Sequence, residues 1–143
     1  MKIFTVGYEG STQAELIAAL QKARVELVID VRAVANSRKP GFSKNVLAAG
    51  LKEAGIEYVH LRALGTPAEG RAAARAGKRD VLERVYAAQL ETPEAGAEAA
   101  RMVMLAGERP SALLCFERDP AECHRTLLRE SVMPGAEVVD LYP

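Results

Sequence analysis

Short apolar runs alternate with helix-forming segments along this chain, and this alternation constrains the fold more than any other feature. The runs are rich in β-branched and aromatic residues, which favour strands. They cover residues 2–6, 26–31, 56–61, 111–116 and 137–140. The run at 26–31 is nearly continuous in apolar character, as expected for a central parallel strand that is covered on both faces.

Helix start signals lie between these runs. The candidate N-caps are Thr12 (with Glu15 in a capping-box pattern), Ser43, Thr92 and Asp119. The stretch 71–107 is helical in pattern, with a restart at Thr92 and Pro93, so two helices are expected there. The last helix is expected to begin at the Asp119 cap and to run to about residue 133.

The resulting order, β-α-β-α-β-α-α-β-α-β, predicts an α/β fold with a mostly parallel sheet. We expect a single-domain three-layer sandwich over residues 1–143, with about five strands and with helices on both faces of the sheet. In such sheets, ligands bind at the carboxyl ends of the strands. Unusual polar residues follow three of the predicted strands, so the functional site is expected at that edge.

The net charge is zero, because 19 Lys and Arg residues balance 19 Asp and Glu residues. This balance argues against a protein that coats nucleic acid by charge alone. The charge is unevenly distributed, since residues 1–80 carry 13 basic and 8 acidic side chains and residues 81–143 carry 6 and 11. The segment 31–52 has basic side chains and no acidic one, which predicts a local site for one small anion. An ordinary solvated surface is the alternative.

The sequence shows no pattern typical of a targeting signal. No apolar stretch approaches the roughly 18 residues of a membrane span, and the apolar run near the N-terminus is too short for a signal peptide. We therefore expect a cytoplasmic protein with no membrane partner. Two cysteines in 143 residues do not make the disulfide framework of a small secreted domain, and no cofactor is predicted.

The turn after the first predicted strand is a candidate anion site. Gly7, Tyr8 and Ser11 precede a capped helix, and backbone N–H groups in such a turn can hold a phosphate or a carboxylate. The alternative is a tight turn that needs glycine for its backbone angles.

Asp30 and Arg32 are two residues apart at the end of a strand, so their side chains point to the same side. One interpretation is a structural ion pair at the sheet edge. The other is that Asp30 orients Arg32 or Arg38 toward an anion, because arginine binds phosphate in a fork. Ser37 and Arg38 follow in the loop and are further candidates for ligand binding.

Cys123, His124 and Arg125 are expected in the first turn of the last helix. A helix N-terminus and a neighbouring cation both stabilise thiolate, so Cys123 is a candidate nucleophile. Adjacent helical residues point about 100° apart, so His124 is expected to meet a group from another loop rather than to share one spot with Cys123. The alternative is that Cys123 packs inward, as free cysteines commonly do.

Cys115 lies inside an apolar strand and is expected to be buried and inert. Glu117 shares its side of the strand, and is either a general base or part of an ion pair with Arg32 or Arg125. The two cysteines and the adjacent histidine match no usual spacing of zinc ligands, so no metal site is predicted.

Basic residues surround the Gly/Pro loop after the third predicted strand, namely Arg62, Arg71, Arg75, Lys78 and Arg79. They are candidates for a lid that closes over an anion, and a solvated helix start is the simpler interpretation. His60 is expected to be packed or at the surface rather than catalytic.

Several short motifs occur together in order along nearly the whole chain. They are Thr5-Val6-Gly7-Tyr8 with Ser11, Asp30-Val31-Arg32 with Ser37, Arg38 and Phe42, Ile56-Glu57-Tyr58, Leu64-Gly65, and Cys115-Phe116-Glu117 with Pro120, Cys123, His124 and Arg125. This set resembles the DUF488 family, a domain of unknown function in bacteria and archaea. The resemblance implies a compact α/β protein and brings no established reaction. The chain differs from the family at 33–36, where prolines are common, and at Thr66, where glycine is common.

The first functional hypothesis is an enzyme or enzyme-like domain that binds or acts on a phosphorylated ligand, such as a nucleotide or a nucleic-acid end. Arg32, Arg38 and Arg125 would hold the phosphate, and Asp30 and Glu117 would orient them or move protons. One alternative is a non-catalytic module that binds nucleic acid or a protein. Another is a thiol redox or sulfur-transfer protein that uses Cys123, together with Cys115. A dimer is compatible with a domain of this size.

Overall fold

The computed structural model describes residues 1–143. Its strands are β1 (Lys2–Gly7), β2 (Leu27–Asp30), β3 (Glu57–His60), β4 (Ser111–Cys115) and β5 (Glu137–Leu141). Its α-helices are α1 (Gln13–Lys22), α2 (Lys44–Glu53), α3 (Ala68–Arg75), α4 (Arg79–Leu90), α5 (Pro93–Glu108) and α6 (His124–Val132), and short 3-10 helices cover Arg62–Leu64 and Pro120–Glu122. None of the helices combines the length and the apolar character that crossing a membrane requires.

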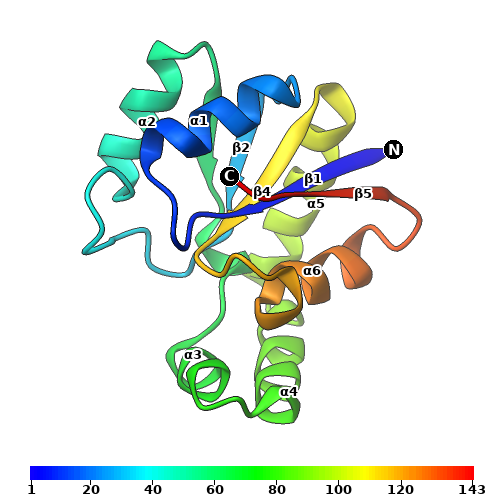
Figure 1. The fold of residues 1–143 in the computed structure, drawn as a ribbon. Coiled ribbons are helices and arrows are strands. Elements are labelled where there is room, and N and C mark those ends of the chain that lie inside the picture. Colours follow the sequence, from blue (N-terminus) through cyan, green and yellow to red (C-terminus); the bar gives the residue numbers. More distant parts are fainter.

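The five strands form one parallel sheet in the order β3-β2-β4-β1-β5. Helices cover both of its faces (Figure 1). The predicted α/β fold with a three-layer arrangement and about five strands is therefore confirmed, and the sheet is parallel throughout rather than mostly so.

Successive residues of a strand contribute their side chains to two separate hydrophobic cores, because side chains alternate between the two faces of a sheet. On one face, Phe4 of β1 belongs to the same buried cluster as Leu16 of α1 and Leu47 of α2. On the other face, the neighbouring Ile3 belongs to a cluster with residues of α4, α5 and α6, among them Met102. The central strands are buried on both sides, which explains their mostly apolar composition.

Two of the predicted N-caps form as expected. Thr12 accepts a hydrogen bond from the backbone N–H of Glu15, and the Glu15 carboxylate accepts one from the N–H of Thr12. Thr92 caps α5 by accepting from the N–H of Ala95. Ser43 precedes α2 without capping it, because its hydroxyl accepts from the N–H of Ser37 and donates to the Ser37 carbonyl oxygen.

The stretch 71–107 holds parts of three helices rather than two. The Ala-rich pattern hides a break after α3, where Gly77 takes a left-handed backbone conformation with φ of 71°. The chain therefore reverses there, and α3 packs against α4 as a helical hairpin. Figure 1 shows this hairpin projecting beyond the body of the sheet and its covering helices.

The last helix also begins later than expected. Asp119 caps only the short 3-10 turn Pro120–Glu122, by accepting from the N–H of Ala121. Cys123 has an extended backbone and is itself the N-cap of α6, so His124 is the first helical residue.

The direction of the connections places a crevice at the carboxyl edge of the sheet. β1 and β2 lead to α1 and α2, which pack on one face. β4 lies between β1 and β2 and leads to α6, which packs on the other face. Loops that diverge in this way leave room for a ligand at the strand ends.

Candidate functional site

A cavity of about 1100 Å³ opens at the carboxyl edge of the sheet. Its wall is formed by the ends of β1, β2 and β4, by the α3–α4 hairpin and by the start of α6. The candidate residues that line it are Tyr8, Arg32, Glu117, Cys123 and His124, together with Cys115. Residues from four separate parts of the sequence thus meet in one place.

Asp30 and Arg32 form a buried ion pair under this cavity. Arg32 Nη2 lies 2.6 Å from Asp30 Oδ2, and Arg32 Nε donates to Asp30 Oδ1 at 2.9 Å. Asp30 is fully buried and Arg32 is 6% exposed. Burial lowers the pKa of Arg32, but the hydrogen bonds and the negative charge of Asp30 outweigh it, so the pKa lies above its ordinary value. Of the interpretations left open by the sequence, the geometry matches the structural ion pair.

The remaining contacts of this pair point into the protein. Arg32 Nη1 donates to the hydroxyl of Tyr8 at 3.2 Å and to the carbonyl oxygen of Phe42 at 2.7 Å. The hydroxyl of Tyr58 donates to Asp30 Oδ2. Because these partners occupy most of its donors, Arg32 is not free to act as the main anion ligand.

The turn after β1 is also occupied by internal hydrogen bonds. The N–H groups of Tyr8 and Glu9 donate to the carbonyl oxygens of Cys115 and Phe116, at 3.3 and 2.8 Å, and the Ser11 N–H donates to the Tyr8 carbonyl oxygen. The predicted use of these N–H groups to hold a phosphate is therefore not supported by the geometry.

Gly7 has a packing role that the sequence did not reveal. A Cβ atom at Gly7 would overlap the carbonyl oxygen of Glu117. Glycine therefore permits the chain that follows β4 to run against the end of β1. This close approach holds the segment between Cys115 and Glu117 in the cavity wall.

The two cysteines meet in that wall. Cys115 is the last residue of β4 and Cys123 is the N-cap of α6, and they are joined as a disulfide with their Cα atoms 7.4 Å apart. Both are nearly fully buried, at 1% and 2% exposure. The expected burial of Cys115 is therefore confirmed, but the residue is bonded to another cysteine, which the expectation of an inert side chain did not include. The inward packing considered for Cys123 takes the form of a bond to Cys115. The short 3-10 turn between them brings the sulfur atoms together, and no spacing rule pointed to it.

His124 contacts both another loop and Cys123. Its Nε2 lies 2.7 Å from the carbonyl oxygen of Val31. A carbonyl only accepts, so Nε2 carries the proton and Nδ1 is an acceptor. Nδ1 lies 3.7 Å from Cys123 Sγ. The predicted contact of His124 with another loop is therefore confirmed. The prediction that His124 and Cys123 point to different places is wrong, because Cys123 has an extended rather than a helical backbone.

Burial controls the protonation of His124. The pKa of its imidazole is lowered to about 4, chiefly by removal from water and also by the nearby positive charge of Arg125, against the opposing effects of the Val31 carbonyl and the Asp30 carboxylate. The ring is therefore neutral at pH 7.

Glu117 faces Cys115, and Arg125 supports the loop that carries it. Glu117 Oε2 lies 3.6 Å from Cys115 Sγ, and burial raises the pKa of the Glu117 carboxyl. Arg125 is fully buried and donates through Nη2 to the Glu117 carbonyl oxygen at 2.6 Å. Burial lowers the pKa of Arg125. Its side chain does not line the cavity, so the predicted phosphate contact of Arg125 is replaced by a structural one.

The other predicted anion ligands lie elsewhere. Ser37 and Arg38 are not part of the cavity wall, and Arg38 is exposed. Besides Arg32, the arginines that line the cavity come from the α3–α4 hairpin, namely Arg71, Arg75 and Arg79. These belong to the group considered above as a lid. The acidic residues of the wall are Glu9, Glu117 and Glu122.

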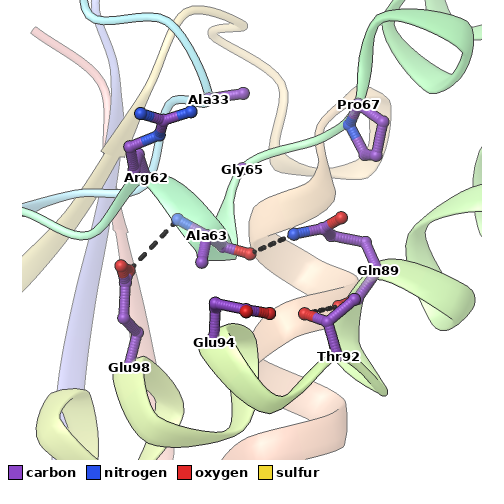
Figure 2. Close-up of a pocket in the computed structure, with 9 residues that line it drawn as sticks. All are labelled: Ala33, Arg62, Ala63, Gly65, Pro67, Gln89, Thr92, Glu94 and Glu98. Carbon is purple, nitrogen blue, oxygen red and sulfur yellow. Dashed lines mark hydrogen bonds between the residues drawn. The ribbon is translucent and has the colours of Figure 1, made fainter.

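A smaller hollow of about 510 Å³ lies beside the 3-10 turn that follows β3. Figure 2 shows Arg62 on one side of it and the carboxylates of Glu94 and Glu98 on the other. Glu98 accepts from the N–H of Ala63 at 3.1 Å, and Gln89 donates to the Ala63 carbonyl oxygen at 2.8 Å. These contacts fix the turn to α4 and α5, which is a structural role. His60 also has a structural role, because its Nε2 lies 2.7 Å from the Arg32 carbonyl oxygen.

The fold and the site define a parallel α/β protein with a cysteine pair in a cavity at the strand ends. The family model described as "Domain of unknown function DUF488" matches residues 12–132. The chain therefore belongs to the DUF488 family, as its motifs suggested. Searches of the curated proteins and of the solved structures found no match.

Replacing Asp30 by Asn should strongly destabilise the protein, because Arg32 would stay buried without its counter-charge. We expect the free energy of unfolding, measured by urea denaturation, to fall by about 3–5 kcal/mol. The matched control is Glu83→Gln, which breaks the exposed Arg79–Glu83 pair and should cost less than about 1 kcal/mol. Equal, small losses in both variants would contradict the structural role of the buried pair.

An NMR titration of the two histidines should give a pKa near 4 for His124. The His60→Gln variant, which lacks the other histidine signal, identifies the signal of His124. The unfolded chain binds a proton at His124 with a pKa of about 6.5, above the folded value, so it carries more protons between these two values. The free energy contributed by a neutral His124 is therefore fully present above pH 6.5 and is lost as the pH falls toward 4. Titration of the His124 ring near 6.5 would show that it is not buried as described.

Proposed function

We propose that this protein is a thiol–disulfide oxidoreductase in which Cys115 and Cys123 alternate between a disulfide and a dithiol. The observation that carries the proposal is the pairing of these cysteines in the wall of the cavity at the strand ends. They are the chain's two cysteines, so no third thiol competes for the pairing. Of the hypotheses drawn from the sequence, thiol redox chemistry has the most direct geometric support.

Cys123 is assigned as the attacking thiol of the reduced protein. It caps the nine-residue helix α6, and the backbone N–H of Arg125 points at its Sγ from 3.5 Å. A helix N-terminus stabilises a thiolate. The unprotonated Nδ1 of His124 lies 3.7 Å away and is placed to accept the thiol proton.

Cys115 is assigned as the resolving thiol. Its neighbour is the carboxylate of Glu117, whose negative charge disfavours a resting thiolate at Cys115. The same carboxylate is within reach to accept the Cys115 proton when the second step occurs.

The proposed steps conserve atoms and electrons. The Cys123 thiolate attacks one sulfur of a substrate disulfide, a mixed disulfide forms, and the first substrate thiolate leaves and takes up a proton. Cys115 then loses its proton to Glu117 and attacks Cys123 Sγ, which expels the second substrate thiolate. The substrate is reduced to two thiols, the protein is oxidised to the disulfide, and an external thiol reverses the change.

Binding or conversion of a phosphorylated ligand is a second candidate function. The observation that favours it is the presence of Arg71, Arg75 and Arg79 in the cavity wall. These arginines take the place of the set first predicted to hold a phosphate, and Glu122 and Glu9 oppose part of their charge. A nucleic acid or a protein partner is less well supported, because the positive charge lies within a cavity of limited size.

Turnover of a chromogenic disulfide in the presence of an excess thiol reductant tests the first candidate. The wild-type protein should release product over many cycles, and Cys123→Ser should release none above the uncatalysed rate. In the same assay without the thiol reductant, pre-reduced Cys115→Ser should release one equivalent and stop as a mixed disulfide that mass spectrometry detects. The matched control is Arg62→Gln, which changes the smaller hollow and should leave turnover unchanged.

Absence of turnover by the wild-type protein would reject the oxidoreductase proposal. Nucleotide binding that raises the melting temperature equally in wild type and Cys123→Ser would favour the second candidate instead.

A further inference from the structure

The same wall holds a second kind of chemistry that disulfide exchange does not use. Ligand atoms of Cys115, Glu117 and Cys123 all lie within 4.8 Å of one another. The two sulfur atoms are buried and the carboxylate is half-buried. Three convergent donors of this kind are the number that an open zinc site takes from its protein.

The donor types select the ion. Thiolate ligands favour Zn²⁺ and similar borderline-soft ions over Mg²⁺ or Ca²⁺, which prefer oxygen. A zinc ion bonds sulfur at about 2.3 Å and carboxylate oxygen at about 2.0–2.2 Å, so its tetrahedral ligands lie roughly 3.5–4 Å apart. The cysteine Cα atoms are 7.4 Å apart, beyond the roughly 4.4–6.8 Å usual for a disulfide, and this spacing leaves room for an ion between the sulfurs once the bond is reduced.

The surroundings provide support for such ligands. The Arg125 N–H points at Cys123 Sγ and would hold its thiolate in place, while Arg125 Nη2 holds the loop that carries Glu117. The three donors line the cavity, so the fourth ligand position faces a space that admits water or a small molecule.

We infer that the reduced protein binds one Zn²⁺-class ion through Cys115 Sγ, Cys123 Sγ and the Glu117 carboxylate, with an open fourth position toward the cavity. The disulfide and the ion exclude each other, because both use the same two sulfurs. A dithiol reductant converts the protein disulfide to two thiols and is itself oxidised to a disulfide. The ion then binds as the two thiol protons leave to solvent. The site needs only the reduced pair and is independent of any exchange turnover.

Cobalt titration of the reduced, metal-stripped protein tests this inference. Co²⁺ bound by thiolate gives a sulfur-to-metal charge-transfer band, which should saturate at one ion per chain and disappear when Zn²⁺ is added. The oxidised wild-type protein should give no band, and it is a control that needs no substitution. Glu117→Gln should weaken Co²⁺ binding by at least about 10-fold. Glu122→Gln, which alters another carboxylate of the same wall, should leave it unchanged.

Three results would overturn the inference. They are the absence of the band in the reduced wild type, a band of equal strength in the oxidised protein, and Co²⁺ affinity that Glu117→Gln leaves unchanged. Circular dichroism of Glu117→Gln shows whether a loss reflects the site or the fold. Disulfide turnover measured with a metal chelator present tests the oxidoreductase separately, so either proposal can fail alone.

Discussion

The ion pair between Asp30 and Arg32 closes the end of β2, and most of the candidate site is attached to it. Through its side chains it holds Tyr8 of the turn after β1 and Tyr58 of β3. The carbonyl oxygen of the residue between them receives the hydrogen bond from His124 at the start of α6. A buried pair of this kind adds little stability over a well-packed apolar core, but loss of one partner leaves an uncompensated charge. Its main contribution is therefore to fix the positions of four chain segments around one cavity.

This arrangement changes which residues are available for chemistry. Arg32 and Arg125 are both committed to internal contacts, one with Asp30 and the other with the backbone carbonyl of Glu117. The thiols remain, together with a neutral His124 and a carboxylate that faces Cys115. The cavity wall thus carries two sulfur atoms, and its arginines other than the Asp30-paired Arg32 come from the α3–α4 hairpin.

The sequence predicted the fold well and the site in part, for physical reasons. Apolar runs and local caps such as Thr12 and Thr92 act over a few residues, so the strands and most helices could be placed. The break at Gly77 was missed because the segments on both sides of it are helical in pattern. The pairing of Cys115 with Cys123 was missed because it depends on a 3-10 turn and on the close approach of two strand ends, neither of which has a local pattern.

The most direct test of the account is the chemical state of Cys115 and Cys123 after mild oxidation. Alkylation followed by mass spectrometry should find a monomer in which neither cysteine is alkylated. A digest should contain a peptide pair in which the two cysteines are linked within one chain. After reduction, both should be alkylated. Two results would contradict the pairing on which the proposed chemistry depends. One is an oxidised monomer in which both cysteines are still alkylated, and the other is a disulfide that links the cysteines of separate chains.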